Sequence, residues 1–241
     1  MFQLTFAIIT PALIVGGFAE RMKFSSMFIF SFVWMILVYA PICHMVCGGG
    51  FLGEMGLMDF AGGTVVHINA GVAAFVLAIY LGNRTGFQTV PMPPHNLSMT
   101  VAGASMLWVG WFGFNGGSQL ALGSKDDVDA ISAVIANTNI AACAGALAAM
   151  ILTQIFYKRV DLTMVLNGAL SGLVAITAGP DFPTMNLAIL IGAIGGLLVV
   201  YAIPMFDKFK IDDPVGALSV HLVSGIWGTL AAVSYTHLTL P

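Results

Sequence analysis

Charged residues are scarce in this sequence. Only 8% of its 241 residues are Asp, Glu, Lys or Arg, whereas 59% are hydrophobic, and a soluble globular domain is usually about a quarter charged. Because so few charges cannot cover a surface that faces water, much of the apolar surface must face lipid. The lysines and arginines occur singly or in pairs and the net charge is −3, which excludes a basic face for nucleic acid.

Cysteine is also rare, with three residues in the chain: Cys43, Cys47 and Cys143. An odd number cannot form a closed disulfide framework, and the spacing matches neither a zinc site nor a redox motif. We therefore expect buried thiols, no metal and no cofactor. No basic segment precedes the apolar stretch that begins at Met1, so the sequence does not predict a signal peptide.

Long apolar segments fill most of the chain. A bilayer core of about 30 Å is crossed by about 20 helical residues, and helix is expected because backbone polar groups in lipid must be satisfied within the segment. The sequence therefore predicts an all-α polytopic membrane protein. Its eight expected spans are residues 2–19, 26–46, 62–81, 98–118, 130–153, 163–179, 186–204 and 215–233.

Basic residues lie in alternate connections between these spans. Seven of the eight fall on one side of the predicted bundle, which the positive-inside rule identifies as cytoplasmic. The loops expected in the cytoplasm contain Arg21 and Lys23, Arg84, Lys158 and Arg159, and Lys208 and Lys210.

Small residues recur at four-residue spacing within several spans, and such faces allow helix backbones to approach closely in lipid. This pattern predicts a tight bundle. The residues concerned are Gly113 and Gly117; Ala141, Gly145 and Ala149; Gly168 and Gly172; and Gly192 and Gly196.

A pattern of the form D-x2-G-x3-V-H-x3-G-[VI] occurs twice. The first copy begins at Asp59 and the second, 154 residues later, at Asp213. The second copy lies five spans after the first, and because this offset is odd, the two copies should cross the membrane in opposite directions. The sequence thus predicts an inverted repeat, the architecture of many transporters, whose sites lie near the midplane between the halves.

Each copy of the repeat contains a histidine, His67 or His221, eight residues after its aspartate. At about 1.5 Å per helical residue this places each imidazole about 12 Å into its span, near the centre of the bilayer. A neutral imidazole there still needs hydrogen bonds. We expect the two rings to face each other and to offer their remaining nitrogens to a small polar solute. The alternative is two core histidines bonded to neighbouring carbonyl groups. His44, near the outer end of its span and without a partner in the repeat, is interpreted as structural or interfacial.

The stretch from Asp59 to Gly71 resembles the signature of the ammonium transporter family, the Amt/Mep/Rh superfamily, and is closer to its Amt branch. The resemblance runs through nearly the whole chain. Its other motifs are Phe2-Gln3-Leu4-Thr5-Phe6, Ala19-Glu20-Arg21, the stretch from Gly110 to Ser118, and Asp212-Asp213-Pro214.

This resemblance implies an eleven-span bundle of two inverted five-span halves, assembled as a homotrimer with one pore per subunit. The eight spans would be the third to the tenth, so we expect the chain to be a fragment. Residues 1–83 would be the remainder of the first half, 84–97 the cytoplasmic loop between the halves, and 98–233 the second half. Residues 234–241 resemble nothing in the family, and we expect them to be a non-native tail.

The resemblance also assigns roles to residues that match the family's motifs. These are Phe2, Ser118 and Asp59 for cation recruitment outside, Phe6 and Phe114 for a stacked gate, and His67 and His221 for the pore. Cys47 stands where the family commonly has tryptophan, which weakens the cation–π attraction expected at the vestibule. The alternative interpretations are packing for the phenylalanines and a helix cap for Asp59.

The function implied is transport of ammonium across the plasma membrane, with no enzymatic step. The cation would bind outside, lose a proton on entry and cross as ammonia, because an ion in a narrow apolar lumen lacks its hydration. A cytoplasmic nitrogen-signalling regulator of the PII type is a further partner that the resemblance implies. Two alternatives remain: a sensor that binds ammonium with little flux, and a membrane haem protein with His67 and His221 as axial ligands.

Overall fold

The computed structural model describes residues 1–237, which form helices and connections without a strand. The first part of the chain contains α1 (Phe2–Ile14), the 3₁₀-helix η1 (Val15–Phe18), α2 (Phe24–Trp34), the π-helix η2 (Met35–Tyr39), α3 (Ala40–Cys47), α4 (Phe51–Glu54), the π-helix η3 (Gly63–Ile68) and α5 (Asn69–Leu81). The second part contains α6 (Leu97–Gly116), the 3₁₀-helix η4 (Gly117–Gln119), α7 (Lys125–Tyr157), α8 (Leu162–Thr177), α9 (Met185–Lys208), the π-helix η5 (Leu218–Val223) and α10 (Ser224–His237).

Each of the eight predicted spans coincides with a helix or with consecutive helices. Six of the described helices are long and apolar enough to cross a membrane, and Phe2–Phe18 and Leu162–Thr177 are shorter apolar helices. The chain is therefore an all-helical integral membrane protein, as predicted. Helix α7 is longer than its predicted span and extends to Lys125 and Tyr157. The last four residues of the expected tail, 238–241, lie outside the described residues.

Side-chain caps fix where four of the helices begin. At each start a side-chain oxygen accepts a hydrogen bond from a backbone N–H group of the first turn, which has no partner within the helix. The capping residues are Asn96 for α6, Ser124 for α7, Asp161 for α8 and Thr184 for α9.

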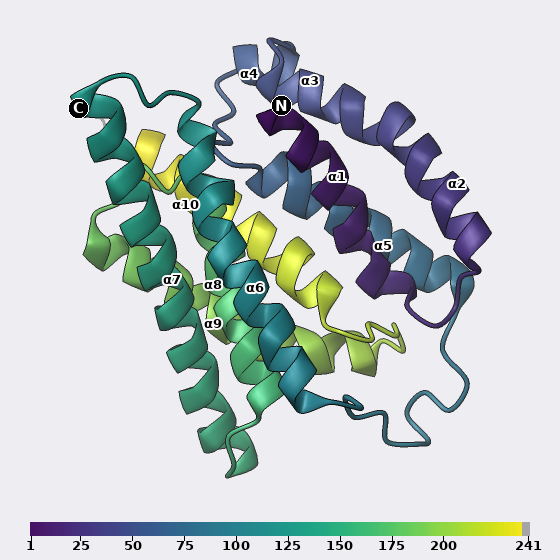
Figure 1. Ribbon diagram of the computed structural model, residues 1–241. Coiled ribbons are helices and arrows are strands. Elements are labelled where there is room, and N and C mark those ends of the chain that lie inside the picture. The colour runs from purple at the N-terminus through teal and green to yellow at the C-terminus, as the bar shows by residue number, and fades with distance from the viewer. Residues whose placement is uncertain (238–241) are drawn as a thin grey trace.

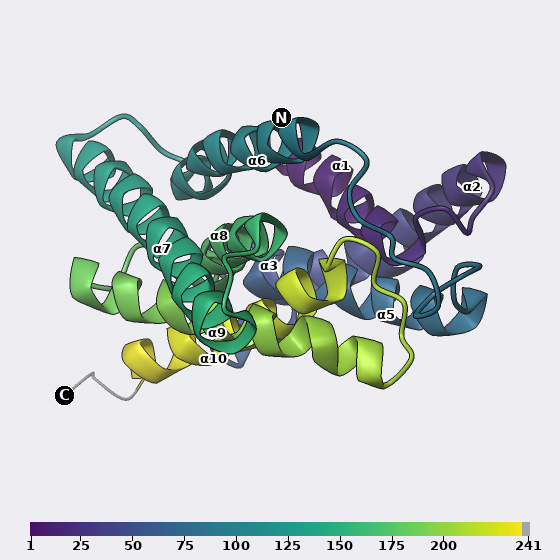
Figure 2. The ribbon, with the colours of Figure 1, turned by 90° about the horizontal axis from the view of Figure 1, so that it is seen from below.

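The helices form two groups with a shared boundary. In Figure 1 the purple-to-blue helices α1 to α5 lie to one side and the teal-to-green helices α6 to α9 to the other. Helix α7 packs against α8 and α9, and η5 with α10 contacts α8 and α9 as well as η3 and α5. Seen from below, α8 lies between α6 and the pair α9 and α10 (Figure 2). The second copy of the repeat thus lies at the boundary between the two groups.

Small residues bring α7, α8 and α9 into backbone contact. A Cβ atom added at Gly196 would meet the carbonyl oxygen of Gly145, and one at Gly192 would meet the carbonyl oxygen of Ala141. Close packing predicted from the four-residue spacing is therefore confirmed for these helices. It is wrong for Gly113, where an added Cβ would have no neighbour within 4 Å.

A buried carboxylate joins three connections that the charge pattern places on one side. Asp212, which precedes η5, has a side chain only 1% exposed and receives hydrogen bonds from the Arg84 guanidinium at 2.9 Å. The Arg21 guanidinium donates to the carbonyl oxygen of Asp212 at 2.9 Å. Burial acts to raise the pKa of Asp212, but the hydrogen bonds and charge of Arg84 outweigh it and lower that pKa. The resemblance motifs at Arg21 and Asp212 therefore meet in space.

The contact between α7 and α9 generates the first prediction. Gly196→Ala should lower the free energy of unfolding by about 1–3 kcal/mol, because an extra methyl group at a packed interface forces the helices apart. The matched control is Gly103→Ala, within α6, where an added Cβ meets nothing within 4 Å. That change should leave stability unchanged or raise it by up to about 1 kcal/mol. Thermal unfolding in detergent measures both, and equal effects of the two substitutions would contradict the packing described.

Candidate functional site

The two copies of the repeat cross each other in opposite directions. The hydroxyl oxygens of Thr64 and Thr229 lie 3.2 Å apart, and a Cβ atom at Gly71 would lie 2.7 Å from the Cα atom of Leu222. Residue numbers therefore rise along one helix, from Thr64 to Gly71, while they fall along the facing helix, from Thr229 to Leu222. The predicted antiparallel relation of the two copies is confirmed.

The last glycine of each copy lies at this crossing. Gly71 touches the backbone of Leu222, and an added Cβ at the equivalent Gly225 would lie 3.1 Å from Ile68 Cγ1 and 3.3 Å from His67 Cβ. A side chain at either position would push the other copy away. The glycine that closes the pattern is thus required by the contact between the two copies.

The aspartate of each copy caps its π-helix. In both copies the carboxylate accepts hydrogen bonds from the backbone N–H groups five and six residues later. These are Thr64 and Val65 for Asp59, at 2.9 Å each, and Leu218 and Ser219 for Asp213, at 3.0 and 3.3 Å. The alternative interpretation of Asp59 as a cap therefore describes its contacts, although a cap can also carry a charge that acts at longer range.

The first glycine of each copy turns the chain into the helix. Gly62 has φ +99° and Gly216 has φ +76°, values in the left-handed region that favours glycine. The residues from Asp59 to Gly62 are not helical, so the expected 12 Å of continuous helix between Asp59 and His67 is wrong. His67 lies in the last turn of η3, and the aspartate folds over the start of that helix.

His67 and His221 contact each other through their Nδ1 atoms, which are 3.2 Å apart. The ring centroids are 5.2 Å apart and the ring planes differ by 9°, so the imidazoles meet edge to edge. One Nδ1 must donate and the other accept, so the rings hold opposite tautomers when both are neutral. His67 is fully buried, and its Nε2 has no hydrogen-bond partner among the described residues.

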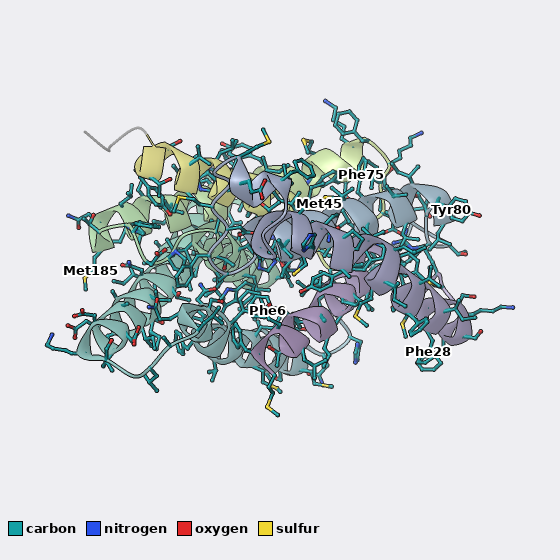
Figure 3. The ribbon with its side chains drawn as sticks, turned by 90° about the horizontal axis from the view of Figure 1, so that it is seen from above. Phe6, Phe28, Met45, Phe75, Tyr80 and Met185 are labelled. Atoms are coloured by element: carbon teal, nitrogen blue, oxygen red, sulfur yellow. The ribbon has the colours of Figure 1, made fainter. Side chains whose placement is uncertain are left out.

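Aromatic rings surround this pair on the side of His67. The rings of Phe6 and Phe114 are stacked at 4.4 Å, with Phe2 4.9 Å from Phe6. Phe114 lies 5.7 Å from His67 and Trp111 lies 5.2 Å from it, nearly parallel at 12°. Figure 3 shows Phe6 in the interior of the helices, whereas Phe28 and Tyr80 extend outward. The two residues assigned to the gate are thus in contact with each other and, through Phe114, with the histidine pair.

The other residues assigned to recruitment lie around Asp59 and Phe114. The Ser118 hydroxyl donates to the carbonyl oxygen of Phe114 at 2.8 Å, and the Sγ of Cys47 lies 3.9 Å from the carbonyl oxygen of Asp59. Cys47 is exposed, so the expectation of a buried thiol is wrong there. Asp59 precedes its span and is partly buried. Burial raises the pKa of Asp59 to about 6, and hydrogen bonds from backbone N–H groups, those of Val65 and Thr64 first, oppose that rise.

Trp111 is the residue of this site to which the sequence analysis gave no role. It lies in the motif from Gly110 to Ser118, three residues before Phe114, so both side chains come from the end of α6. A tryptophan in a span rich in aromatic residues carries no signal that distinguishes a pore contact from packing. Its place beside His67 emerges from the crossing of α6 with the repeat.

The direct contact of His67 with His221 does not fit a haem held between them. No group of three or more His, Cys, Asp or Glu side chains that could hold a metal occurs in the described part of the chain. The Nδ1 atoms of His67 and His221 bond directly at 3.2 Å, which leaves no room for an iron and its porphyrin between them. The haem alternative, with His67 and His221 as axial ligands, therefore does not fit this geometry.

Known proteins with similar sequences share one family. A model of the Ammonium Transporter Family matches residues 1–239. The ammonium transporter of Bacillus subtilis (strain 168) is 45% identical over 232 residues, which are 96% of this chain and 56% of that protein. Amt1 of Archaeoglobus fulgidus is 42% identical over 231 residues, 96% of this chain and 58% of that protein. The chain thus spans a little over half the length of these curated relatives.

Solved structures with a similar fold belong to the same group. The crystal structure of Saccharomyces cerevisiae Mep2 has a TM-score of 0.88 and 33% sequence identity, over 95% of this chain and 52% of that chain. A structure described as a sensor Amt protein has a TM-score of 0.90 and 36% identity, over 96% of this chain and 59% of that chain.

The crossing of the repeats generates the second prediction. Gly71→Ala should separate η3 from η5, lower the free energy of unfolding by about 1–3 kcal/mol, and break the hydrogen bond between the two Nδ1 atoms. ¹⁵N spectra of histidine-labelled protein report that bond. The control is Val72→Ala, because the adjacent side chain is 46% exposed. Retention of the Nδ1 signals in Gly71→Ala would show that the glycine contact does not hold the pair.

Proposed function

The chain belongs to the ammonium transporter family, and we propose that it carries ammonium across a membrane, as ammonia, through a pore that contains His67 and His221. The observation that carries this proposal is the direct Nδ1 contact of two imidazoles beside stacked aromatic rings, one imidazole having an Nε2 with no hydrogen-bond partner among the described residues. The resemblance motifs and the family of the relatives support the same substrate.

The histidine pair suits a neutral amine. With one proton between the Nδ1 atoms, one Nε2 is a bare acceptor and the other carries a proton. Ammonia has three N–H donors and one lone pair, so it can bond to either nitrogen as it passes. A potassium ion has no proton to lose and would enter this apolar region without its hydration, at a cost of several kcal/mol or more. Discrimination between two cations of similar size thus follows from deprotonation.

Recruitment precedes this step. Phe2 and Ser118 lie beside the ring stack of Phe6 and Phe114, where an aromatic face attracts a compact cation by about 0.5–2 kcal/mol. Asp59 adds a negative charge outside the lumen. Because Cys47 provides no ring, this vestibule attracts the cation less strongly than one with a tryptophan at that position.

We further propose that the protein lies in the plasma membrane as a homotrimer, with the connections around Arg21, Arg84 and Asp212 in the cytoplasm. A regulator of the PII type would approach from that side. The fold is also similar to a structure described as a sensor Amt protein, so binding with little flux is the second candidate function. Comparison of ammonium binding with liposome flux in the full-length protein distinguishes the two.

The histidine pair generates the third prediction. His67→Ala or His221→Ala should lower ammonium uptake into liposomes about tenfold or more, or abolish its selectivity over potassium, because each loses a hydrogen bond to the permeating molecule. The matched control is His44→Ala, since His44 lies exposed in α3 and should tolerate the change. Unaltered, selective uptake by both pore variants would refute the assigned role.

The two roles considered for Asp59, a helix cap and a negative charge that attracts the cation, generate the fourth prediction. Asp59→Asn keeps an acceptor for the cap but removes the charge, and it should raise the half-saturating ammonium concentration about fivefold, as expected for the loss of about 1 kcal/mol of attraction. Asp213→Asn alters the equivalent cap at the other copy and should leave that concentration unchanged. If wild type and Asp59→Asn have equal half-saturating ammonium concentrations, Asp59 acts only as a helix cap and does not attract the cation.

A further inference from the structure

A buried polar network lies behind the ring of Trp111. The indole Nε1 donates to the Thr177 hydroxyl at 2.8 Å, and the same hydroxyl lies 2.6 Å from the carbonyl oxygen of Leu173 and 3.3 Å from Asn115 Oδ1. Asn115 Nδ2 donates to the Thr138 hydroxyl at 2.9 Å. The network thus connects α6, α7 and α8.

These polar groups are fully enclosed. Asn115, Thr138 and Thr177 have no exposed surface, and Trp111 is 5% exposed. Polar groups in such an interior are costly unless they are bonded, and a satisfied network fixes the orientation of its members. The network therefore holds the plane of the indole ring in one position.

Thr177 also holds the segment that leads to His67. Its carbonyl oxygen accepts a hydrogen bond from the Ala61 N–H at 3.1 Å, and the Ala178 carbonyl oxygen accepts one from the Phe60 N–H at 2.8 Å. These bonds attach the chain between Asp59 and Gly62 to the end of α8. One residue thus positions both the start of η3, through its backbone, and Trp111, through its side chain.

The ring of His67 has few other supports. Among the described residues its Nε2 has no hydrogen-bond partner, so its orientation depends on the Nδ1 bond to His221 and on its aromatic neighbours. Trp111 is the neighbour whose plane is nearly parallel to it, at 12°. A change in the indole plane would therefore allow the imidazole to rotate away from His221.

We propose that Thr177 and Asn115 are positioning residues that fix Trp111 and, through it, hold His67 in the orientation in which its Nδ1 meets His221. Neither residue contacts the permeating molecule. The consequence for transport rests on the proposed function, whereas the consequence for the histidine pair does not.

The test compares Thr177→Val with Thr177→Ser in the full-length protein. Valine matches threonine in shape and removes the hydroxyl, whereas serine keeps it. In liposomes Thr177→Val should lower the maximal ammonium uptake rate per folded protein about tenfold, since misplacement of a distant group can cost up to about a hundredfold. The half-saturating concentration should stay within about twofold, because recruitment outside is intact. Thr177→Ser should restore the rate.

Two further arms separate the possible outcomes. ¹⁵N spectra of histidine-labelled protein should show that the Nδ1 bond is lost in Thr177→Val and kept in Thr177→Ser. Thr138→Val, at the far end of the network, should weaken the same signal less and is the substitute if Thr177→Val fails to fold. A wild-type protein that shows no flux overturns the proposed function, and the spectra still decide the positioning role. An intact Nδ1 bond in both valine variants, or an equal loss in Thr177→Ser and Thr177→Val, overturns the positioning role.

Discussion

The hydrogen bond between the Nδ1 atoms of His67 and His221 is the contact on which the rest of the site depends. Two imidazolium rings could not form it, because each would present a donor, so its presence identifies a pair of rings with one shared proton. The crossing of the repeats brings the two histidines together, and three other residues of each copy contribute: the aspartates cap, the first glycines turn, and the last glycines allow contact.

Much of this arrangement could be predicted from the sequence because the repeat is long and its spacing is constant. The apolar segments predict the spans, and the offset of five spans between the two copies, an odd number, predicts their antiparallel relation. The π-helices at His67 and His221 could not be predicted, because an extra residue in a helical turn is a response to tertiary contacts and caps. The non-helical segment from Asp59 to Gly62 could not be predicted either. For that reason the distance from Asp59 to His67 expected for continuous helix was wrong.

Trp111 and Thr177 show the other limit of sequence reasoning. They are separated by 66 residues in the chain, and neither belongs to the repeat. Aromatic and hydroxyl residues are common in apolar spans, so only the packing of α6 on α8 reveals that Trp111 donates to Thr177 and lies beside His67. The motif around Trp111 indicated that the segment resembles the family, but it did not separate the residues proposed to line the pore from those proposed to support them.

The central claim is that ammonia passes the histidine pair, whereas a cation such as potassium does not. Its most direct test is a measurement of ammonium and potassium fluxes in the same liposomes, with the full-length wild-type protein and equal gradients of the two ions. The account predicts rapid uptake of ammonium nitrogen and no protein-dependent flux of potassium. Comparable fluxes of the two ions would contradict it, because they would show that the lumen admits a hydrated or bare cation past the histidine pair.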